Sequence, residues 1–165
     1  MREEHDKTGT VLVVDDTPEN IDILNAALSE EFEVIIATNG EKALGIASDL
    51  QPDLILLDIM MPGMDGYEVC SRLKQQESTC HIPVIFITAL NEIENEEKGF
   101  ALGCVDYLTK PIIPTVALAR VKTHISIGHS RKELQEWNSN LKGRVKALSS
   151  LVTEKVQELA SVKFP

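Results

Sequence analysis

Four short signals in the sequence place carboxylates, a hydroxyl and an amine at the ends of apolar runs. Asp15 and Asp16 close the first of these runs, and Asp58 closes a later one. Thr88 and Lys110 close two more. Carboxylates of this kind bind a hard cation such as Mg²⁺, while an amine and a hydroxyl suit the oxygens of a phosphoryl group. The set predicts a metal-dependent site at which a carboxylate accepts a phosphoryl group.

These residues must be positioned by regular elements, and the sequence alternates short apolar runs with segments of helical period. Five strands are predicted, at residues 10–14, 33–37, 54–57, 84–88 and 105–108. All but the second are continuously apolar, which is typical of parallel strands covered on both faces. Helices are predicted between them at residues 18–29, 41–48, 66–75 and 93–102. The alternation indicates an α/β fold with a doubly wound parallel sheet, whose strands share one carboxyl edge. We expect the four signals to meet at that edge.

The charge of the chain narrows the classes of partner. The sequence has 165 residues and a formal net charge of −10. Residues 1–123 carry 22 acidic and 9 basic side chains, a net charge of −13, whereas the remainder carries 4 and 7, a net charge of +3. Nucleic-acid backbones are bound mainly by clustered Lys and Arg. The distribution therefore argues against direct nucleic-acid binding and suits a cation site.

The cysteines and the lack of long apolar runs indicate the cellular compartment of the protein. Cys70, Cys80 and Cys104 are odd in number and widely separated, which favours free thiols over a disulfide framework or a zinc cluster. No apolar run reaches the roughly 18 residues of a membrane span, and residues 1–9 lack an apolar signal region. We expect a soluble protein of a reducing, cytoplasmic compartment, with residues 1–9 as a flexible N-terminus.

The residues around the four signals form longer motifs, in an order that is specific to one family. The motifs are LVVDD at 12–16, LLDIMMPGMDG at 56–66, PVIFITA at 83–89 and GCVDYLTKP at 103–111. Together they resemble the two-component response regulator receiver domain, of which CheY-like proteins are members. The resemblance covers about the first 125 residues. We therefore predict a receiver domain at residues 10–125, with a flavodoxin-like sheet in the order 2-1-3-4-5.

The resemblance implies specific roles for the acidic residues. Asp58 accepts a phosphoryl group from a sensor histidine kinase or a phosphotransfer protein. Asp16 and Asp58 bind Mg²⁺ directly, Asp15 acts through water, and the backbone carbonyl of Met60 supplies a further ligand. Mg²⁺ prefers oxygen ligands and keeps several waters, which agrees with this allocation. The chain would be a regulatory phosphoacceptor rather than an enzyme that acts on a separate substrate.

The resemblance also implies how the site acts as a switch. Lys110 places a positive charge on the phosphoryl oxygens, and the Thr88 hydroxyl donates a hydrogen bond to one of them. The bond between Lys110 and Pro111 is commonly cis in this family. Movement of Thr88 lets the aromatic side chain of Tyr107 rotate inward. The surface that changes is the fourth helix, the fifth strand and the fifth helix, through which such receivers pair.

Each signal taken alone has a simpler explanation, because a single Asp or Thr at a strand end is usually a helix cap. Only the joint occurrence of the signals favours a phosphoacceptor. Two other classes stay open: an aspartyl-nucleophile phosphatase of the haloacid dehalogenase type, and a scaffold whose site no longer works. The first usually has a second Asp two positions after the nucleophile, where this sequence has Met60. The second is disfavoured by the presence of all four signals.

Residues 126–165 form a second region, in which apolar residues repeat at helical spacing. The intervals are 3, 4, 4, 3, 4, 4 and 3, over the residues Leu134, Trp137, Leu141, Val145, Leu148, Val152, Val156 and Leu159. This spacing keeps one apolar stripe on one face of a helix and fits an eleven-residue repeat better than heptads. We predict a parallel homodimeric stalk, either continuous with the fifth helix or broken near Gly128. The alternative is that this helix folds back on its own receiver.

The stalk resembles the linkers of regulators that carry cyclic-di-GMP phosphodiesterase domains of the HD-GYP type or diguanylate cyclase domains. The residues that carry the likeness are 110–112 and 119–124. The sequence contains no His-Asp motif and no Gly-Gly-Asp/Glu-Glu-Phe motif. Two expectations follow: a receiver-plus-linker fragment of a larger regulator whose C-terminal output domain is missing, or a regulator that acts only through protein contacts. A helix-turn-helix transcription factor is not indicated, because the basic residues of the tail are scattered.

Overall fold

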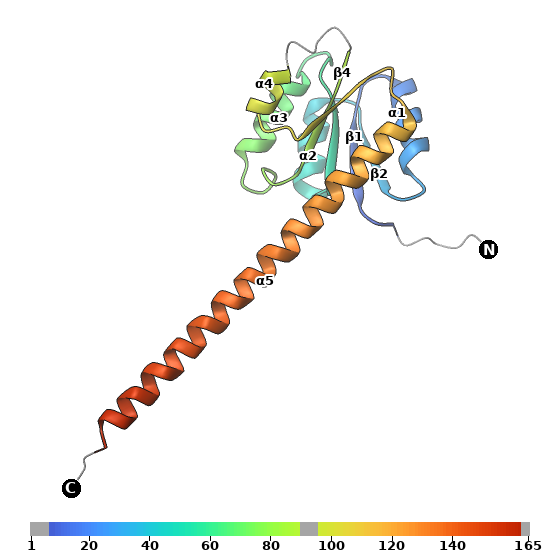
Figure 1. The fold of residues 1–165 in the computed structure, drawn as a ribbon. Helices are drawn as coiled ribbons and strands as arrows, with labels where there is room; N and C mark the ends of the chain where they lie inside the picture. Colours follow the sequence, from blue (N-terminus) through green and yellow to red (C-terminus); the bar gives the residue numbers. More distant parts are fainter. Residues whose placement is uncertain (1–6, 90–95, 163–165) are drawn as a thin grey trace. The chain divides into compact units, whose positions relative to one another are not determined.

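The computed structural model of the protein describes residues 7–89 and 96–162, and its fold is that of an α/β domain followed by a long helix (Figure 1). Five strands form one parallel sheet in the order β2-β1-β3-β4-β5, as the sequence predicts. The strands are β1 (Thr10–Val14), β2 (Glu33–Ala37), β3 (Leu54–Asp58), β4 (Val84–Ala89) and β5 (Asp106–Lys110). The helices are α1 (Pro18–Leu28), α2 (Gly40–Leu50), α3 (Gly66–Gln75), α4 (Glu96–Ala101) and α5 (Pro114–Ala160). No helix of the described ranges is long and apolar enough to cross a membrane.

Apolar side chains fill both faces of the sheet, because every central strand is buried on both sides. On one face, the strands pack against Leu24 and Leu28 of α1 and against Val121 and Ile125 of α5. On the other face, they pack against α2 and α3 through a second cluster that includes Val69. Fully burying one such side chain stabilises a fold by about 1.5–3 kcal/mol. The two clusters therefore hold the sheet rigid beneath its carboxyl edge.

Some element boundaries differ from the predicted ones, most clearly at β5. The apolar run predicts a strand at 105–108, whereas β5 covers Asp106–Lys110. Val105 is exposed, and pairing with β4 continues to the pair Ala89 and Lys110. Pairing with a neighbouring strand thus decides the register at this edge of the sheet. Asp58 and Lys110 are the last residues of β3 and β5, beyond the predicted strand ends at 57 and 108, whereas Thr88 lies within β4 as predicted.

The helix boundaries also differ by a few residues. Helix α2 begins at Gly40 because the Asn39 side chain accepts a hydrogen bond from the Lys42 amide at 2.9 Å, which caps the helix. The helix predicted at 93–102 is seen as α4, Glu96–Ala101, and positions 93–95 lie outside the described residues. Of the N-terminal segment predicted at 1–9, residues 1–6 also lie outside them.

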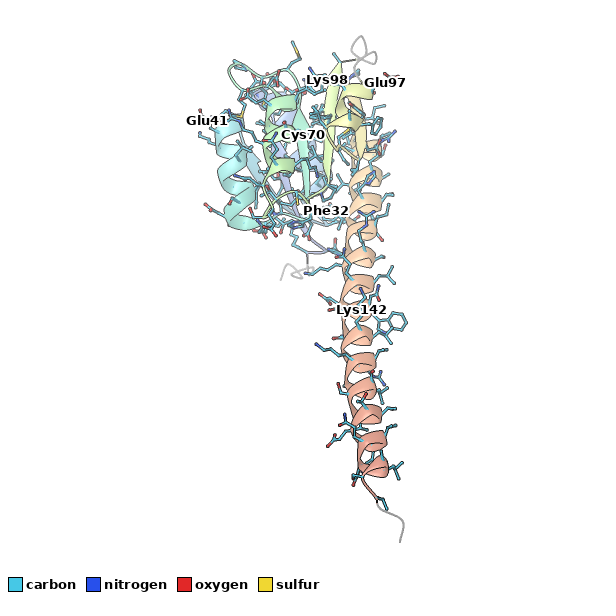
Figure 2. The ribbon with its side chains drawn as sticks, turned by 90° about the vertical axis from the view of Figure 1, so that its left-hand side faces the viewer. Phe32, Glu41, Cys70, Glu97, Lys98 and Lys142 are labelled. Atoms are coloured by element: carbon cyan, nitrogen blue, oxygen red, sulfur yellow. The ribbon has the colours of Figure 1, made fainter. Side chains whose placement is uncertain are left out.

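The chain divides into two compact units, Met1–Ser126 and Ile127–Pro165. Helix α5 runs without interruption from Pro114 to Ala160, so Gly128 does not break it. Within the second unit the side chains, including that of Lys142, project from all sides of the helix (Figure 2). All eight residues of the predicted stripe lie in this unit. Seven of them are 59–71 % exposed and Leu141 is half-buried.

Candidate phosphoacceptor site

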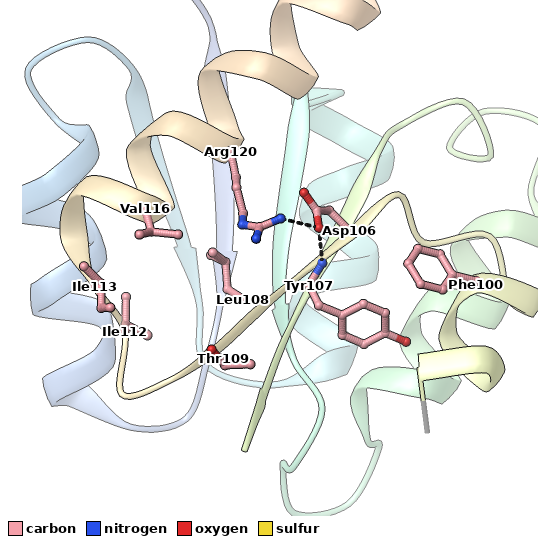
Figure 3. Close-up of a pocket in the computed structure, with 9 residues that line it drawn as sticks. All are labelled: Phe100, Asp106, Tyr107, Leu108, Thr109, Ile112, Ile113, Val116 and Arg120. Atoms are coloured by element: carbon pink, nitrogen blue, oxygen red, sulfur yellow. Dashed lines mark hydrogen bonds and ion pairs between the residues drawn. The ribbon is translucent and has the colours of Figure 1, made fainter. Parts of the chain in front are cut away.

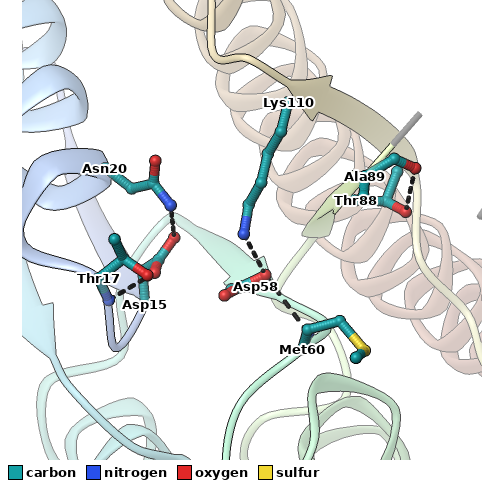
Figure 4. Close-up of polar contacts among 8 residues, drawn as sticks. All are labelled: Asp15, Thr17, Asn20, Asp58, Met60, Thr88, Ala89 and Lys110. Carbon is teal, nitrogen blue, oxygen red and sulfur yellow. Dashed lines mark hydrogen bonds and ion pairs between the residues drawn. The ribbon is translucent and has the colours of Figure 1, made fainter. Parts of the chain in front are cut away.

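Asp58 is the last residue of β3, and its carboxylate is almost completely buried. Lys110, the last residue of β5, places its Nζ 3.0 Å from Asp58 Oδ1 (Figure 4). The Met60 amide donates a longer hydrogen bond of 3.4 Å to the same oxygen. The other oxygen, Oδ2, is buried and has no hydrogen-bond partner among the described residues. Buried polar atoms are rarely left unpaired, so Oδ2 marks a position where a ligand is required.

The backbone between β3 and α3 holds Asp58 in place through a close contact at Gly66. The Gly66 amide donates to the Ile59 carbonyl at 2.9 Å, which closes the loop onto the strand end. A Cβ atom at Gly66 would overlap the Asp58 carbonyl oxygen and lie 2.8 Å from the Ile59 Cα. Only glycine therefore permits this approach. The Asp65 side chain caps α3 by accepting from the Glu68 amide at 2.9 Å.

Three carboxylates meet at this edge of the sheet. Ligand oxygens of Asp15, Asp16 and Asp58 lie within 4.8 Å of one another. Asp15 is buried and both of its oxygens are engaged: Oδ1 accepts from the Thr17 amide at 2.9 Å, and Oδ2 accepts from Asn20 Nδ2 at 3.1 Å. Asp16 is exposed. These contacts orient Asp15 within the cluster and leave Asp16 at its open side.

The surroundings of Asp58 change its acidity. Burial raises the pKa of the Asp58 carboxyl from 3.8 to about 6, and the negative charge of Asp15 adds to the increase. The hydrogen bond and the positive charge of Lys110 act in the opposite direction, as does the Met60 amide. The carboxylates of the cluster therefore repel one another, and the positive charge of Lys110 offsets this repulsion only in part. A bound cation would relieve the remainder.

Thr88 and Tyr107 lie on the neighbouring strands. Asp58 pairs with Ile87 across the sheet, so the buried Thr88 follows one position further along β4, and its Oγ1 lies 3.3 Å from the Ala89 carbonyl oxygen (Figure 4). Tyr107 lies in β5 with its side chain buried. Its ring centroid is 5.7 Å from that of Phe86 in β4. The bond between Lys110 and Pro111 is cis, as the resemblance implies.

A second polar cluster lies on the surface of β5 and α5. Asp106 pairs with Arg120 Nη1 at 2.6 Å and with His124 Nε2 at 3.0 Å. Burial by itself raises the pKa of Asp106, but the hydrogen bonds from Arg120, His124 and the Tyr107 amide outweigh it, and the pKa lies below its usual value. A cavity of about 210 Å³ opens beside this cluster, with Tyr107, Arg120 and their neighbours around it (Figure 3). The three acidic residues of the phosphoacceptor site do not line it.

Two contributors to the site carry no separate signal in the sequence. Asn20 lies in the first turn of α1 and reads as an ordinary polar helix residue, although its side chain binds Asp15. The steric requirement at Gly66 is likewise invisible, because glycine also fits an unremarkable loop end. Its position after a Pro-Gly-containing loop, as the first residue of a predicted helix, is the signal that could have indicated a close approach.

Comparisons with known proteins agree with this geometry. Residues 11–122 match the response regulator receiver domain family. The chain is 41 % identical over 136 residues to a "probable cyclic di-GMP phosphodiesterase" of Vibrio cholerae, a match that covers 82 % of this chain and 31 % of that protein. It is 47 % identical over 114 residues to the response regulator PleD of Caulobacter vibrioides, covering 68 % of this chain and 25 % of PleD. The chain thus spans about a quarter to a third of the length of these relatives.

Solved structures give the same result for the fold. The receiver domain of the Francisella response regulator 1452 superposes with a TM-score of 0.66 at 31 % identity, covering 72 % of this chain and 97 % of that one. The CheY4 chemotaxis response regulator of Vibrio cholerae gives a TM-score of 0.66 at 28 % identity and covers 70 % of this chain and 97 % of that one. With the sheet order, the clustered carboxylates and the family match taken together, the chain belongs to the response regulator receiver domain family.

Proposed function

We propose that this protein is the phosphoacceptor of a two-component signalling system, with Asp58 as the residue that takes the phosphoryl group. The observation that carries the proposal is the pairing of Asp58 Oδ1 with Lys110 at 3.0 Å, while no residue in ranges 7–89 and 96–162 forms a hydrogen bond with the buried Oδ2. Neither a helix cap nor a structural ion pair accounts for an unpaired buried carboxylate oxygen. The donor is the phosphohistidine of a sensor histidine kinase or a phosphotransfer protein.

The transfer follows from the chemistry of the carboxylate. An oxygen of Asp58 attacks phosphorus, the phosphorus–nitrogen bond of the phosphohistidine breaks, and the histidine nitrogen leaves with the electron pair and takes up a proton. The attacking group must be ionised, and a pKa of about 6 leaves it ionised at neutral pH. Lys110 is placed to balance the negative charge that the phosphoryl oxygens bring to the site.

The donor set at this edge fits Mg²⁺. All available ligands are oxygens, three carboxylates converge within 4.8 Å, and one of them has an unpaired buried oxygen. We assign the direct contacts to Asp16, Asp58 and the Met60 carbonyl, with Asp15 acting through water because its own oxygens already accept hydrogen bonds. When bound, the cation would neutralise the carboxylates and the incoming phosphoryl charge.

Switching is proposed to run from Thr88 to Tyr107. A hydrogen bond from the Thr88 hydroxyl to a phosphoryl oxygen would favour one position of that side chain. Tyr107 pairs with Phe86, two positions before Thr88 in β4, so both side chains face the same side of the sheet. Phosphorylation would thus favour one packing arrangement of the side chains on α4, β5 and α5 over another. Asp106 and Arg120 lie on this face, and its apolar residues Phe100 and Val116 are exposed. We propose this face as one of the two contacts of a homodimer.

The other contact is the apolar stripe of α5, which begins at Leu134 and ends at Leu159. An isolated helix in water gains little stability from its own hydrogen bonds, and an apolar stripe with no cover is unfavourable. Leu151, which is also exposed, widens the stripe beside Leu148. A parallel pairing of two stalks would bury these side chains and bring two receivers together. The three cysteines are free thiols, which supports a cytoplasmic setting.

A small phosphodonor such as acetyl phosphate tests the proposal without knowledge of the kinase. Incubation with Mg²⁺ should add one phosphoryl group to the protein, and Asp58→Asn or a chelator should prevent the addition. Lys110→Ala should slow it, because the charge opposite Asp58 is lost. Unchanged phosphorylation of Asp58→Asn would contradict the proposal.

A second proposal concerns the output. The match to the Vibrio cholerae protein covers 136 residues, more than the 126 of the unit Met1–Ser126, so it reaches into the stalk. This extent favours a receiver and linker that control a cyclic-di-GMP phosphodiesterase or diguanylate cyclase domain. The reading frame beyond Pro165 decides the matter: an HD-GYP or diguanylate cyclase domain there would support it, and a stop codon would contradict it.

A further inference from the structure

Four aromatic rings lie in a row, one each from α3, β4, β5 and α4, and Tyr107 is the ring from β5. Tyr67 in α3 contacts Phe86 in β4 with ring centroids 5.4 Å apart, in an edge-to-face arrangement. Phe86 contacts Tyr107, whose ring lies 5.3 Å from that of Phe100 in α4. Aromatic pairs at such distances contribute about 0.5–1.5 kcal/mol beyond the area they bury. The row stabilises the inward position of Tyr107.

Gly99 in α4 supplies the space for the end of the Tyr107 ring. A Cβ atom at Gly99 would overlap the Tyr107 hydroxyl, and it would lie 2.7 Å from Tyr107 Cζ and 3.1 Å from Phe86 Cδ2. Contacts below 3.0 Å are not tolerated without movement of one partner. All three atoms belong to side chains, so a side chain at position 99 requires the Tyr107 ring to move.

The backbone itself gives no reason for glycine here. Gly99 is helical without a positive φ, and glycine within a helix costs about 0.5–1 kcal/mol relative to alanine. Gly45 in α2 provides the contrast, since a Cβ there would meet nothing within 4 Å. A glycine in a helix of this chain therefore does not always avoid a steric clash, but the glycine at position 99 does.

We infer that Gly99 is the positioning residue of Tyr107: its missing side chain opens the space that the inward ring occupies, and a single methyl group there displaces the ring. The consequence for signalling rests on the proposed function of Asp58, Thr88 and Tyr107. Coupling between two sites is reciprocal. If occupation of the phosphoacceptor site favours the inward position of the ring, a residue that blocks this position must therefore lower the affinity of the site for its ligand by the factor that couples the two.

Fluorine NMR of the full chain labelled with 3-fluorotyrosine tests the position of the ring. The chain has two tyrosines, so Tyr67→Phe assigns their signals. In the wild type the Tyr107 signal should change little when H₂O is replaced by D₂O, because the side chain is 8 % exposed. Gly99→Ala should increase this solvent effect several-fold. Gly45→Ala, which adds the same methyl group in open space, should leave it unchanged. A Tyr107 signal unaltered by Gly99→Ala would overturn the inference.

A second comparison decides the matter even if Gly99→Ala folds poorly. In a Tyr107→Ala background the methyl group at position 99 no longer meets the tyrosine ring, so Gly99→Ala should cost little or even raise the melting temperature. In the presence of Tyr107 it should lower the melting temperature. An equal loss in both backgrounds would show that the clearance serves another contact, and would refute the assignment.

Titration with beryllofluoride in the presence of Mg²⁺ tests the coupling. Gly99→Ala should require several-fold more beryllofluoride for half-saturation than the wild type or Gly45→Ala, a shift that a general loss of stability in a folded protein does not produce. Equal half-saturation with a displaced ring would refute the coupling. No binding to the wild type would instead contradict the proposed function, while the fluorine experiment would still decide the role of Gly99.

Discussion

The raised pKa of Asp58 predicts that its ionised carboxylate destabilises the folded protein at neutral pH. The folded pKa of about 6 lies above the ordinary value of 3.8, so the folded state prefers the protonated carboxyl. The contribution of this group to the free energy of unfolding is fully present at a pH below the ordinary pKa, and it is lost as the pH rises through about 6. Asp58→Asn removes the ionisation, and with it this loss.

The magnitude follows from the size of the shift. One pKa unit corresponds to about 1.36 kcal/mol, so a shift of roughly two units costs about 3 kcal/mol at a pH well above 6. At a pH of about 4.5 only about 1 kcal/mol of this cost has developed. The free energy of unfolding of Asp58→Asn, minus that of the wild type, should therefore increase by about 2 kcal/mol between pH 4.5 and pH 7.5.

Urea unfolding in the presence of a chelator measures this difference. Trp137 lies in the stalk, so both proteins should carry Trp137→Phe, and the fluorescence of Tyr67 and Tyr107 then reports on the receiver. Asp22→Asn, which removes an exposed carboxylate from α1, is the matched control. A difference between Asp58→Asn and the wild type that stays constant across this pH range would refute the reasoning. Mg²⁺ should reverse the order by stabilising only the wild type.

Three further predictions concern the loop, the β5 surface and the stalk. Gly66→Ala should lower the free energy of unfolding by about 1–3 kcal/mol, because its methyl group overlaps the backbone at the end of β3, as urea titration would measure. Arg120→Ala should raise the pKa of Asp106, since the hydrogen bond that lowers it is lost; carboxyl carbon shifts in an NMR titration report this. Replacing Leu141 and Leu148 with Glu should convert a dimer to a monomer in light scattering, because charges would enter the apolar stripe.

Each of these predictions has a control and a contrary outcome. Gly45→Ala should not destabilise the protein, and an equal loss there would contradict the steric explanation at Gly66. An unchanged Asp106 pKa in Arg120→Ala would mean that other groups set it. Ser139→Glu adds a charge on the side of α5 opposite the stripe and should preserve the dimer. A wild-type monomer at every concentration, with and without beryllofluoride, would contradict the stalk proposal.

The sequence predicts the sheet and the identity of the clustered residues because these depend on local patterns. Buried parallel strands read as apolar runs, and Asp16 and Asp58 follow from their positions at the carboxyl ends. The bounds of β5 differ from the predicted ones by one residue at the start and two at the end, because its pairing with β4 outweighs the apolar run that begins at Val105. The roles of Asn20 and Gly99 depend on contacts between elements distant along the chain, which periodicity does not report.

Direct identification of the phosphorylated residue tests the central claim most sharply. After reaction with acetyl phosphate and Mg²⁺, borohydride reduction converts an aspartyl phosphate to homoserine, which peptide mass spectrometry locates. The account predicts homoserine at position 58 in the wild type and none in Asp58→Asn or in a sample treated with chelator. Modification at any other carboxylate, or no modification of the wild type, would contradict it.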